Sequence, residues 1–399
     1  GMIRINAEHC TGCRTCEQLC PQKCISMEPD KNGFLYPEID RSRCVGCGLC
    51  EQRCPANVQT APSRKPDVYA AWLKDEKVLN ESSSGGAFTA LAEYVLSRGG
   101  AVFGCAFDEQ MTAIHICART TEELNRLRGS KYVQSDTGDT FAQAKLLLER
   151  NVPVLYSGTP CQIAGLKAFL RKDYSNLLTV DLVCHGVPSP MFFKKYLEWL
   201  KRKKQGNILK FSFRDKSKFG WGICGKALLG RGSQKISEWL TPQLDPYLTV
   251  FLSGDNYRGC CYSCPYASPK RVGDFTIGDF WGIEKPHPEI PRKGGVSVLM
   301  LNSEKAFSAF PELKKSLFVA EATFEQASVE NRQLLAPTER SKKRGAFLAA
   351  AQEEDFQAVV LLWKKYYWKN ILTADLKRRV PPGFKRAVKK CLKAAGRAK

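Results

Sequence analysis

The pattern of hydrophobic and polar positions changes period repeatedly along the middle of the chain. Apolar runs of strand length lie at 101–107, 112–118, 152–156, 177–183, 275–282 and 296–301. Between them, apolar residues recur every three or four positions, as on one face of a helix, at 89–96, 121–127, 141–150, 162–170, 191–203 and 304–313. Strands that alternate with helices predict an open α/β sheet.

The segments on either side follow other patterns. Residues 1–60 carry two short repeats separated by an Asn-Gly pair at 32–33, which predicts a hairpin turn. Residues 60–66 are rich in proline and polar residues and are predicted to be a linker. Residues 208–252 alternate and carry aromatic side chains, which indicates mostly antiparallel strands. From about residue 346 the pattern is helical and increasingly basic.

These changes divide the chain of 399 residues, which is long for a single core, into four predicted regions. They are a unit at 1–60, two parts of a central region at 67–150 and 151–330, and a helical basic extension at 331–399. Hydrophobic residues make up 43% of the chain, as in globular proteins. We expect no signal peptide and no transmembrane helix, because no apolar run is long enough. A cytoplasmic protein with reduced cysteines is therefore predicted.

The formal charge of +21 is concentrated near the C-terminus. Residues 364–399 hold thirteen lysines and arginines and a single acid, Asp375. A run of this kind is usually a solvated helix or a surface that docks an acidic protein, and it can also contact an anionic membrane. Nothing in the sequence resembles a nucleic-acid-binding module, so no nucleic-acid partner is expected.

Two identical runs account for eight of the eighteen cysteines. Each run reads C-x2-C-x2-C-x3-C-P, at 10–21 and at 44–55. Two-cluster bacterial ferredoxins use this spacing, in which three thiolates bind one 4Fe-4S cluster and the fourth binds the other. Zinc sites usually take two pairs of ligands, and a disulfide framework is the other alternative. One cluster is predicted at Cys10, Cys13, Cys16 and Cys54, and the other at Cys44, Cys47, Cys50 and Cys20.

Four further cysteines lie where an α/β sheet binds ligands. Cys161 and Cys184 each follow a predicted strand and precede a helix, and the carboxyl ends of such strands form the binding edge of the sheet. Cys261 and Cys264 form a C-x2-C pair on a predicted loop. These thiols could bind a third 4Fe-4S cluster, a zinc ion or no metal, and Cys260 could replace Cys261. The remaining cysteines have no ligand spacing and are expected to be structural: Cys24, Cys105, Cys117, Cys224 and Cys391.

The central region resembles a known family. The matching motifs are Ser-Gly-Gly-Ala-Phe (84–88), Ser-Lys-Tyr-Val-Gln-Ser (130–135), Gly-Thr-Pro-Cys-Gln-Ile (158–163), Cys-His-Gly-Val-Pro-Ser-Pro (184–190) and Ile-Gly-Asp-Phe-Trp-Gly (277–282). Across about 67–330 the sequence resembles the beta-subunit family of coenzyme F420 hydrogenases and dehydrogenases. The resemblance implies a flavin, FAD rather than FMN, beside the third 4Fe-4S cluster. It also implies hydride exchange with a deazaflavin or another two-electron acceptor.

With this resemblance, the predicted fold class is a multidomain protein of α+β and α/β type. A bacterial-type ferredoxin unit comes first, an α/β domain for flavin and iron–sulfur follows, and a basic helical extension ends the chain. The resemblance does not cover that extension. Members of the family that act with a hydrogenase are subunits of a complex and commonly lack a fused ferredoxin unit, so this chain looks able to receive electrons by itself.

Two of the matched segments carry the predicted flavin contacts. Small residues before a helix leave N–H groups free for a pyrophosphate, although an ordinary helix start would look the same. Lys131 could place its charge beside a flavin phosphate or the reduced ring, or be a surface lysine. His185 and Asp279 could relay a proton and orient a ligand, respectively, but a hydrogen bond and a structural turn are simpler roles. The predicted contacts are Ser83, Ser84, Gly85, Gly86, Ser130, Lys131, Tyr132 and Gln134.

These features predict a flavin- and iron–sulfur-dependent oxidoreductase, with no catalytic residue assigned. It would pass electrons between a low-potential one-electron carrier and a two-electron acceptor. Its partners would be a redox protein, namely a ferredoxin or a dehydrogenase or hydrogenase subunit, and a small-molecule hydride acceptor. One alternative is a reductase that acts on a saccharide-linked substrate. Another is a non-catalytic electron-transfer subunit of a larger complex.

Overall fold

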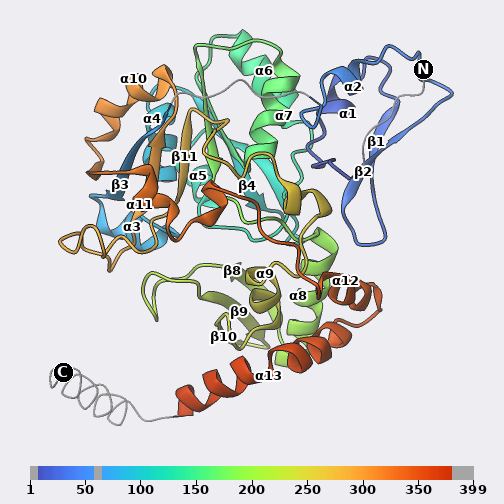
Figure 1. The fold of residues 1–399 in the computed structure, drawn as a ribbon, viewed down its shortest axis with the longest axis vertical. Coiled ribbons are helices and arrows are strands. Elements are labelled where there is room, and N and C mark those ends of the chain that lie inside the picture. Colours follow the sequence, from blue (N-terminus) through green and yellow to red (C-terminus); the bar gives the residue numbers. More distant parts are fainter. Residues whose placement is uncertain (1–7, 58–64, 380–399) are drawn as a thin grey trace.

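The computed structural model describes residues 8–57 and 65–379, and a small N-terminal unit lies beside a large sheet (Figure 1). The unit consists of α1 (Thr15–Leu19), β1 (Ile25–Pro29), β2 (Leu35–Ile39) and α2 (Leu49–Gln52). The two strands are antiparallel, with Ile25 opposite Ile39, so the predicted hairpin is confirmed. Its turn needs Gly33, which has φ +80° and would bring an added Cβ within 2.3 Å of the Cβ of Met191. Most of the predicted linker lies outside the described residues.

A mixed sheet of eight strands forms the body of the molecule. The strands are β3 (Asp67–Leu73), β4 (Ala101–Phe107), β5 (Ala113–Ala118), β6 (Val154–Gly158), β7 (Leu177–Leu182), β11 (Phe275–Asp279), β12 (Ser297–Leu301) and β13 (Leu317–Ala322). Their order is β13-β3-β12-β11-β7-β6-β4-β5. The four strands from β11 to β4 are parallel, which confirms the predicted α/β sheet, and the outer pairs are antiparallel. Strands β3 and β13 were not predicted.

Helices cover both faces of this sheet (Figure 1). One face packs against α3 (Glu76–Glu81), α4 (Ala87–Leu96), α5 (Thr121–Leu127) and α10 (Glu304–Leu313). The other face packs against α6 (Thr140–Glu149), α7 (Pro160–Leu170) and, further along, α11 (Phe324–Ser328) with the 3-10 turn η2 (Arg332–Leu334). Every residue of β6 and β12 is buried, as expected for central strands covered on both faces. The sheet takes strands from both predicted parts of the central region, and the division at residue 150 stays a prediction.

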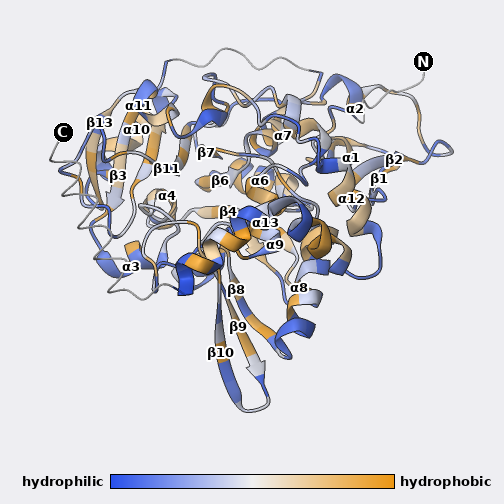
Figure 2. Cartoon of the chain, turned by 60° about the horizontal axis from the view of Figure 1, so that its bottom comes forward, coloured by the Kyte–Doolittle hydropathy of each residue, from blue (hydrophilic) through white to orange (hydrophobic). Residues whose placement is uncertain are grey.

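A second lobe lies below the main sheet in Figure 1 and is called the lower lobe. It contains α8 (Pro190–Lys204), β8 (Asn207–Ser212), β9 (Gly225–Arg231), β10 (Gln234–Leu240), α9 (Pro246–Leu252), α12 (Arg344–Gln352) and α13 (Gln357–Arg379). The three strands form an antiparallel sheet that extends away from the body in Figure 2. The expectation of antiparallel structure over 208–252 is therefore right for the strands and wrong for α9.

The sequence marks the start of three helices in the same way. Prolines at 160, 190 and 246 occupy the first turns of α7, α8 and α9, where a missing N–H costs nothing. Each is preceded by a capping residue: Thr159 with Gln162 in a capping box, Ser189, and Asp245. The Asp245-Pro246 pair explains why the aromatic stretch after β10 becomes a helix. Among the described residues, no helix has the length and apolar character needed to cross a membrane.

Candidate redox site

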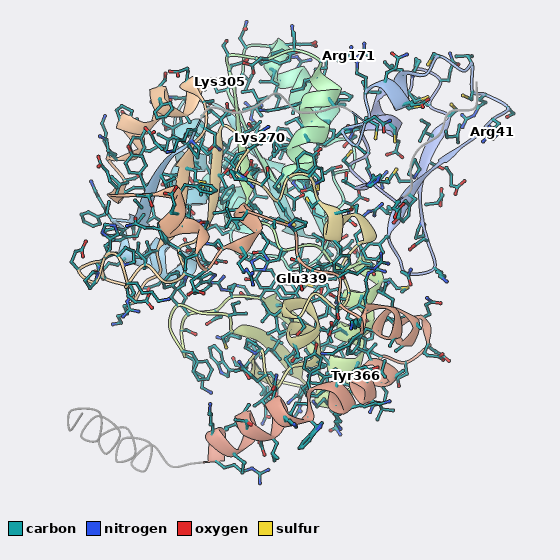
Figure 3. The ribbon with its side chains drawn as sticks, in the orientation of Figure 1. Arg41, Arg171, Lys270, Lys305, Glu339 and Tyr366 are labelled. Carbon is teal, nitrogen blue, oxygen red and sulfur yellow. The ribbon has the colours of Figure 1, made fainter. Side chains whose placement is uncertain are left out.

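The two cysteine runs fold into matching loops. Gly12 and Arg14 in the first run have φ of 70° and 62°, and Gly46 and Gly48 at the equivalent positions of the second have 68° and 70°. These left-handed residues curl each loop tightly, so that cysteines three positions apart face the same interior. Figure 3 shows sulfur atoms gathered inside this unit.

The first predicted ligand set comes together in the structure. Burial raises the pKa of Cys16, and the charges of Cys13, Cys10 and Cys54 raise it further. Burial likewise raises the pKa of Cys54 to about 11, with Cys13 and Cys10 adding to the effect. Because such electrostatic effects weaken with distance, the four thiols are neighbours, and a 4Fe-4S cluster bound by them stays a prediction.

The second predicted set lines a cavity. Cys20, Cys44, Cys47 and Cys50 all face it, together with Cys24 and apolar side chains such as Ile25 and Ile39. The Sγ atoms of Cys20 and Cys24 are 3.4 Å apart. Across the described residues, no three His, Cys, Asp or Glu side chains converge closely enough to hold a single metal ion. Thiolates are the ligands of both 4Fe-4S clusters and zinc, and the assignment of a cluster to this set rests on the spacing of its cysteines.

The third predicted set meets at the carboxyl edge of the main sheet. Cys161 lies in the first turn of α7 after β6, and Cys184 follows β7, the parallel neighbour of β6. Cys261 belongs to the 3-10 turn η1 (Gly259–Ser263), and Cys264 comes next. Burial raises the pKa of Cys161, and the charge of Cys264 is the second cause. The charges of Cys184 and Cys260 raise this pKa further. Burial and the charge of Cys264 also raise the pKa of Cys184 to about 12.

Cys260 lies in this group as well, so five thiols share the site. Its charge influences Cys161, Cys184, Cys261 and Cys264. The choice between Cys260 and Cys261 as fourth ligand therefore stays open. The loop after Cys264 is held by a buried ion pair, in which Arg271 Nη2 donates to Asp181 Oδ1 over 2.6 Å. This pair fixes Cys264 against the end of β7.

The first and third sets lie against each other. The hydroxyl of Thr15 donates to the carbonyl of Gly165 in α7 over 2.9 Å. A Cβ at Gly165 would lie 2.9 Å from the Cβ of Cys13, so only glycine permits this approach. Burial raises the pKa of Tyr266, and the charges of Cys161 and Cys13 add to it, which places the phenol between the two sets.

Arg258 occupies the same junction and is fully buried. Its Nε donates to the carbonyl of Cys10 over 2.7 Å, and its Nη2 donates to the carbonyl of Leu35 over 2.8 Å. Nη2 also lies 3.6 Å from the Sγ of Cys10. The pKa of Cys260 is lowered to about 7. A hydrogen bond with Cys261 is the larger cause, and the positive charge of the Arg258 guanidinium is the next. One cation thus faces both thiol sets.

Other contacts fix the ferredoxin unit on the body. Arg14 pairs with Asp136, and its Nη2 donates to Oδ2 over 2.7 Å. Gln134, a predicted flavin contact, instead donates to the carbonyl of Thr11 over 2.9 Å. The structure therefore places Gln134 at the junction between the ferredoxin unit and the sheet.

The two segments predicted to bind flavin do meet. The N–H of Ser130 donates to the hydroxyl of Ser83 over 2.8 Å. Gly86 starts α4 with φ +80° and no side-chain cap, which leaves the first turn of this helix available to an anion. Gly85 has a packing role, since an added Cβ would lie 2.1 Å from the carbonyl oxygen of Ala71.

Lys131 is half-buried, and its ammonium is held by backbone carbonyls. Its ammonium donates to the carbonyls of Arg126, Leu127 and Arg128, at the C-terminal end of α5. Burial lowers its pKa to about 8. The structure thus assigns Lys131 a capping contact, and its predicted contact with flavin stays a prediction.

Sequence reasoning missed the most elaborate polar cluster beside these segments. Arg214, on the loop after β8, donates through Nη1 and Nη2 to both carboxylate oxygens of Asp279, each over 2.8 Å. Its Nη2 also donates to the carbonyl of Ser83 over 2.9 Å. Trp221 donates to Asp279 over 2.7 Å and stacks on Trp281 with ring centroids 4.7 Å apart. The aspartate of the 277–282 motif was the available signal, but its partner lies 65 residues away.

Two further groups connect this cluster to its surroundings. Lys216 donates to the carbonyls of Leu79, Ser84 and Gly294, and burial, followed by the charge of Arg214, lowers its pKa to about 7. Burial also lowers the pKa of His185, next to Cys184, and the charge of Asp279 opposes that shift. The Arg214–Asp279 pair therefore lies close to the third thiol set.

Comparisons with known proteins agree with the motifs. Residues 68–140 match the model of the coenzyme F420 hydrogenase/dehydrogenase beta subunit N-terminus, and residues 153–326 match that of its C-terminus. Residues 9–58 match the 4Fe-4S dicluster domain. A search of the curated proteins found no significant match. Among solved structures, a chain of the F420-reducing NiFe hydrogenase complex from Methanosarcina barkeri has 15% identity and a TM-score of 0.47, covering 77% of this chain and 94% of that one.

Proposed function

The chain belongs to the coenzyme F420 hydrogenase/dehydrogenase beta-subunit family, and we propose that it is an oxidoreductase that passes electrons between a low-potential one-electron carrier and a two-electron acceptor. The observation that carries the proposal is the contact between three cysteine sets. Cys16 of the first set packs against the buried side chains of Cys24 and Cys50, and Cys50 belongs to the second set. Tyr266 and Arg258 lie between the first and third. Short separations of this kind are what electron transfer requires.

The residues fit the groups that the family implies. The two quartets of the N-terminal unit would each hold a 4Fe-4S cluster, and Cys161, Cys184 and Cys264 would hold a third with Cys261 or Cys260. Bound clusters supply one-electron chemistry, and a bound flavin supplies exchange between one and two electrons. The chain itself orients these thiols. It buries Cys10 and Cys50, leaves most of the others half-buried and leaves Cys47 exposed.

For flavin, the support is the meeting of Ser83 with Ser130 at an uncapped helix start. Arg214 and Lys216 add cationic groups that fix the carbonyls of Ser83 and Ser84. Lys216 also has a pKa near neutrality, so it could hold or release a proton at its Nζ. FAD is proposed over FMN because the segment before α4 offers N–H groups to a pyrophosphate.

The test is anaerobic purification of the full chain, followed by an absorbance spectrum and by iron and flavin counts. We expect about twelve irons, four for each cluster, and one flavin. The protein should then oxidise a reduced low-potential carrier and reduce a deazaflavin or another organic acceptor. Flavin content should fall in Ser83→Ala and Lys131→Ala and be kept in Lys145→Ala, which changes a partly exposed lysine on α6. Equal flavin content in all three would remove both segments from the site.

A second candidate is an electron-transfer subunit of a larger complex, which the beta-subunit description of the matching family favours. In that case the purified chain should load iron and flavin yet stay inert with small acceptors. Activity would appear only when a second polypeptide is added. Turnover by the isolated chain would exclude this candidate.

A further inference from the structure

The last helix carries an apolar surface that the described residues do not cover. The first half of α13 is anchored to the lower lobe through Val359, Val360, Trp363 and Tyr367, which are buried. Trp363 Nε1 donates to the hydroxyl of Thr249 over 3.0 Å. The backbone leaves the helical conformation at Tyr367. From Trp368 to Arg379, the last described residue, no side chain is buried.

Three apolar side chains after this kink form one stripe. Trp368, Leu372 and Leu376 are 56%, 51% and 55% exposed, and a spacing of four places them along one face of the helix. We call them the apolar stripe. Another side of the helix contacts protein, since Ile371 packs on the core of the lower lobe. Arg378 lines a cavity with Trp199 and Trp239, although 70% of its side chain is exposed. The stripe therefore points away from the molecule.

Cations lie on the same side as the stripe. Helical periodicity after the kink places Lys369 and Arg379 beside its members, and the ammonium of Lys369 lies 5.5 Å from the ring centroid of Trp368. Arg379 also pairs with Asp375 over 2.7 Å. Figure 2 shows hydrophobic and hydrophilic residues side by side along α13. Tyr366, labelled in Figure 3, lies where α13 passes α12, with its ring centroid 5.9 Å from that of Phe347.

The sequence beyond the described residues continues the pattern. Apolar residues recur every four positions at Val380, Phe384, Val388 and Leu392, after which the chain ends at residue 399. Ten of the thirteen cations in 364–399 follow Leu376, and no acid does.

We propose that the second half of α13, through the apolar stripe and the cations beside it, docks the protein on the surface of an anionic membrane. Tryptophan and leucine enter the boundary between headgroups and acyl chains, while lysine and arginine on the same face extend to lipid phosphates and carboxylates. A groove in a partner protein fits this face less well, because it would bury the charge of Lys369 with the stripe. Nucleic acid would pair with the cations and leave the stripe exposed. The proposal does not depend on the identity of the redox substrate.

The experiment is flotation of the full-length, iron-loaded protein with lipid vesicles. Binding should be at least about tenfold stronger to phosphatidylcholine vesicles that contain phosphatidylserine than to phosphatidylcholine alone, and should weaken as salt is added. The variant Trp368→Ser/Leu372→Ser/Leu376→Ser should lose most of this binding. A matched control, Leu146→Ser/Val329→Ser/Leu335→Ser, removes three equally exposed apolar side chains elsewhere and should keep it.

Iron content and the absorbance spectrum report folding in each variant, and no change is expected because all substituted side chains are exposed. Three outcomes would overturn the proposal. They are equal binding to neutral and anionic vesicles, equal losses in the stripe variant and the control, and a stripe that mediates only self-association. Binding of a polyanionic RNA in preference to vesicles, unaffected by the stripe variant, would assign the segment to nucleic acid instead.

Discussion

Replacing Arg258 should lower the reduction potential of the cluster held by Cys10. The guanidinium is a permanent positive charge with no exposure to water, and its Nη2 lies 3.6 Å from Cys10 Sγ. A nearby cation stabilises the more negative, reduced state of an iron–sulfur cluster, as does a hydrogen bond to sulfur. Arg258→Met removes the charge and keeps an apolar stem, whereas Arg258→Lys keeps the charge.

The size of the effect follows from the distance. A unit charge 3.6 Å from another interacts by about 5 kcal/mol at an effective dielectric constant of about 20. An electron added to a cluster is shared among several atoms that lie farther away, so we take roughly half of that value. At about 2.3 kcal/mol per 100 mV, Arg258→Met should lower the potential by on the order of 100 mV. Arg258→Lys should shift it by much less.

The assay is a redox titration of the anaerobically purified protein, monitored by electron paramagnetic resonance. Arg41→Met is the control, because it removes the same charge from an exposed position of the ferredoxin unit (labelled in Figure 3), where water and salt screen it. Iron content must match the parent, since Arg258→Met also leaves the carbonyls of Cys10 and Leu35 without their donor. A potential unchanged in Arg258→Met, or lowered equally in Arg41→Met, would refute the reasoning.

Two other predictions address the third thiol set and acid stability. Cys261→Ser should lose about four of the expected irons while Cys260→Ser keeps them; the reverse result in an iron assay would assign Cys260 as the ligand. Burial lowers the pKa of His115 from its ordinary 6.5 to about 4. Between pH 6.5 and 4, His115 therefore binds a proton in the unfolded chain but not in the folded one. Stability should therefore fall by about 3 kcal/mol as pH drops from 6.5 to 4. Urea unfolding of His115→Gln should show a shallower loss over this range, and a slope equal to that of the parent would contradict it.

The sequence was most informative where function depends on residues close together in the chain. In each cysteine run the ligand spacing, the left-handed positions and the terminal proline lie within twelve residues. Local chemistry therefore predicts the loop, and Cys10, Cys13 and Cys54 are close enough to Cys16 for their charges to raise its pKa. Apolar periodicity predicted α7 and α8 to within two residues of the prolines that start them. Helix α9 was missed because the aromatic residues of 208–252 were interpreted as strands, although Asp245-Pro246 marks its start.

Contacts between distant segments explain what the sequence did not predict. Arg214 and Asp279 are 65 positions apart, and Arg258 and Cys10 are 248 apart. An arginine in a loop has no periodicity or spacing that distinguishes a buried partner from a solvated side chain, so neither residue could be selected beforehand.

Lys131 is the opposite case, because its motif was recognised in the sequence but its contacts were not predicted. The three carbonyls that its ammonium contacts come from the end of α5, and only the fold brings a cation there to offset the negative end of that helix. A motif lysine is thus as well explained by the helix it caps as by a cofactor. For that reason the flavin content of Lys131→Ala, more than the family resemblance, decides its role.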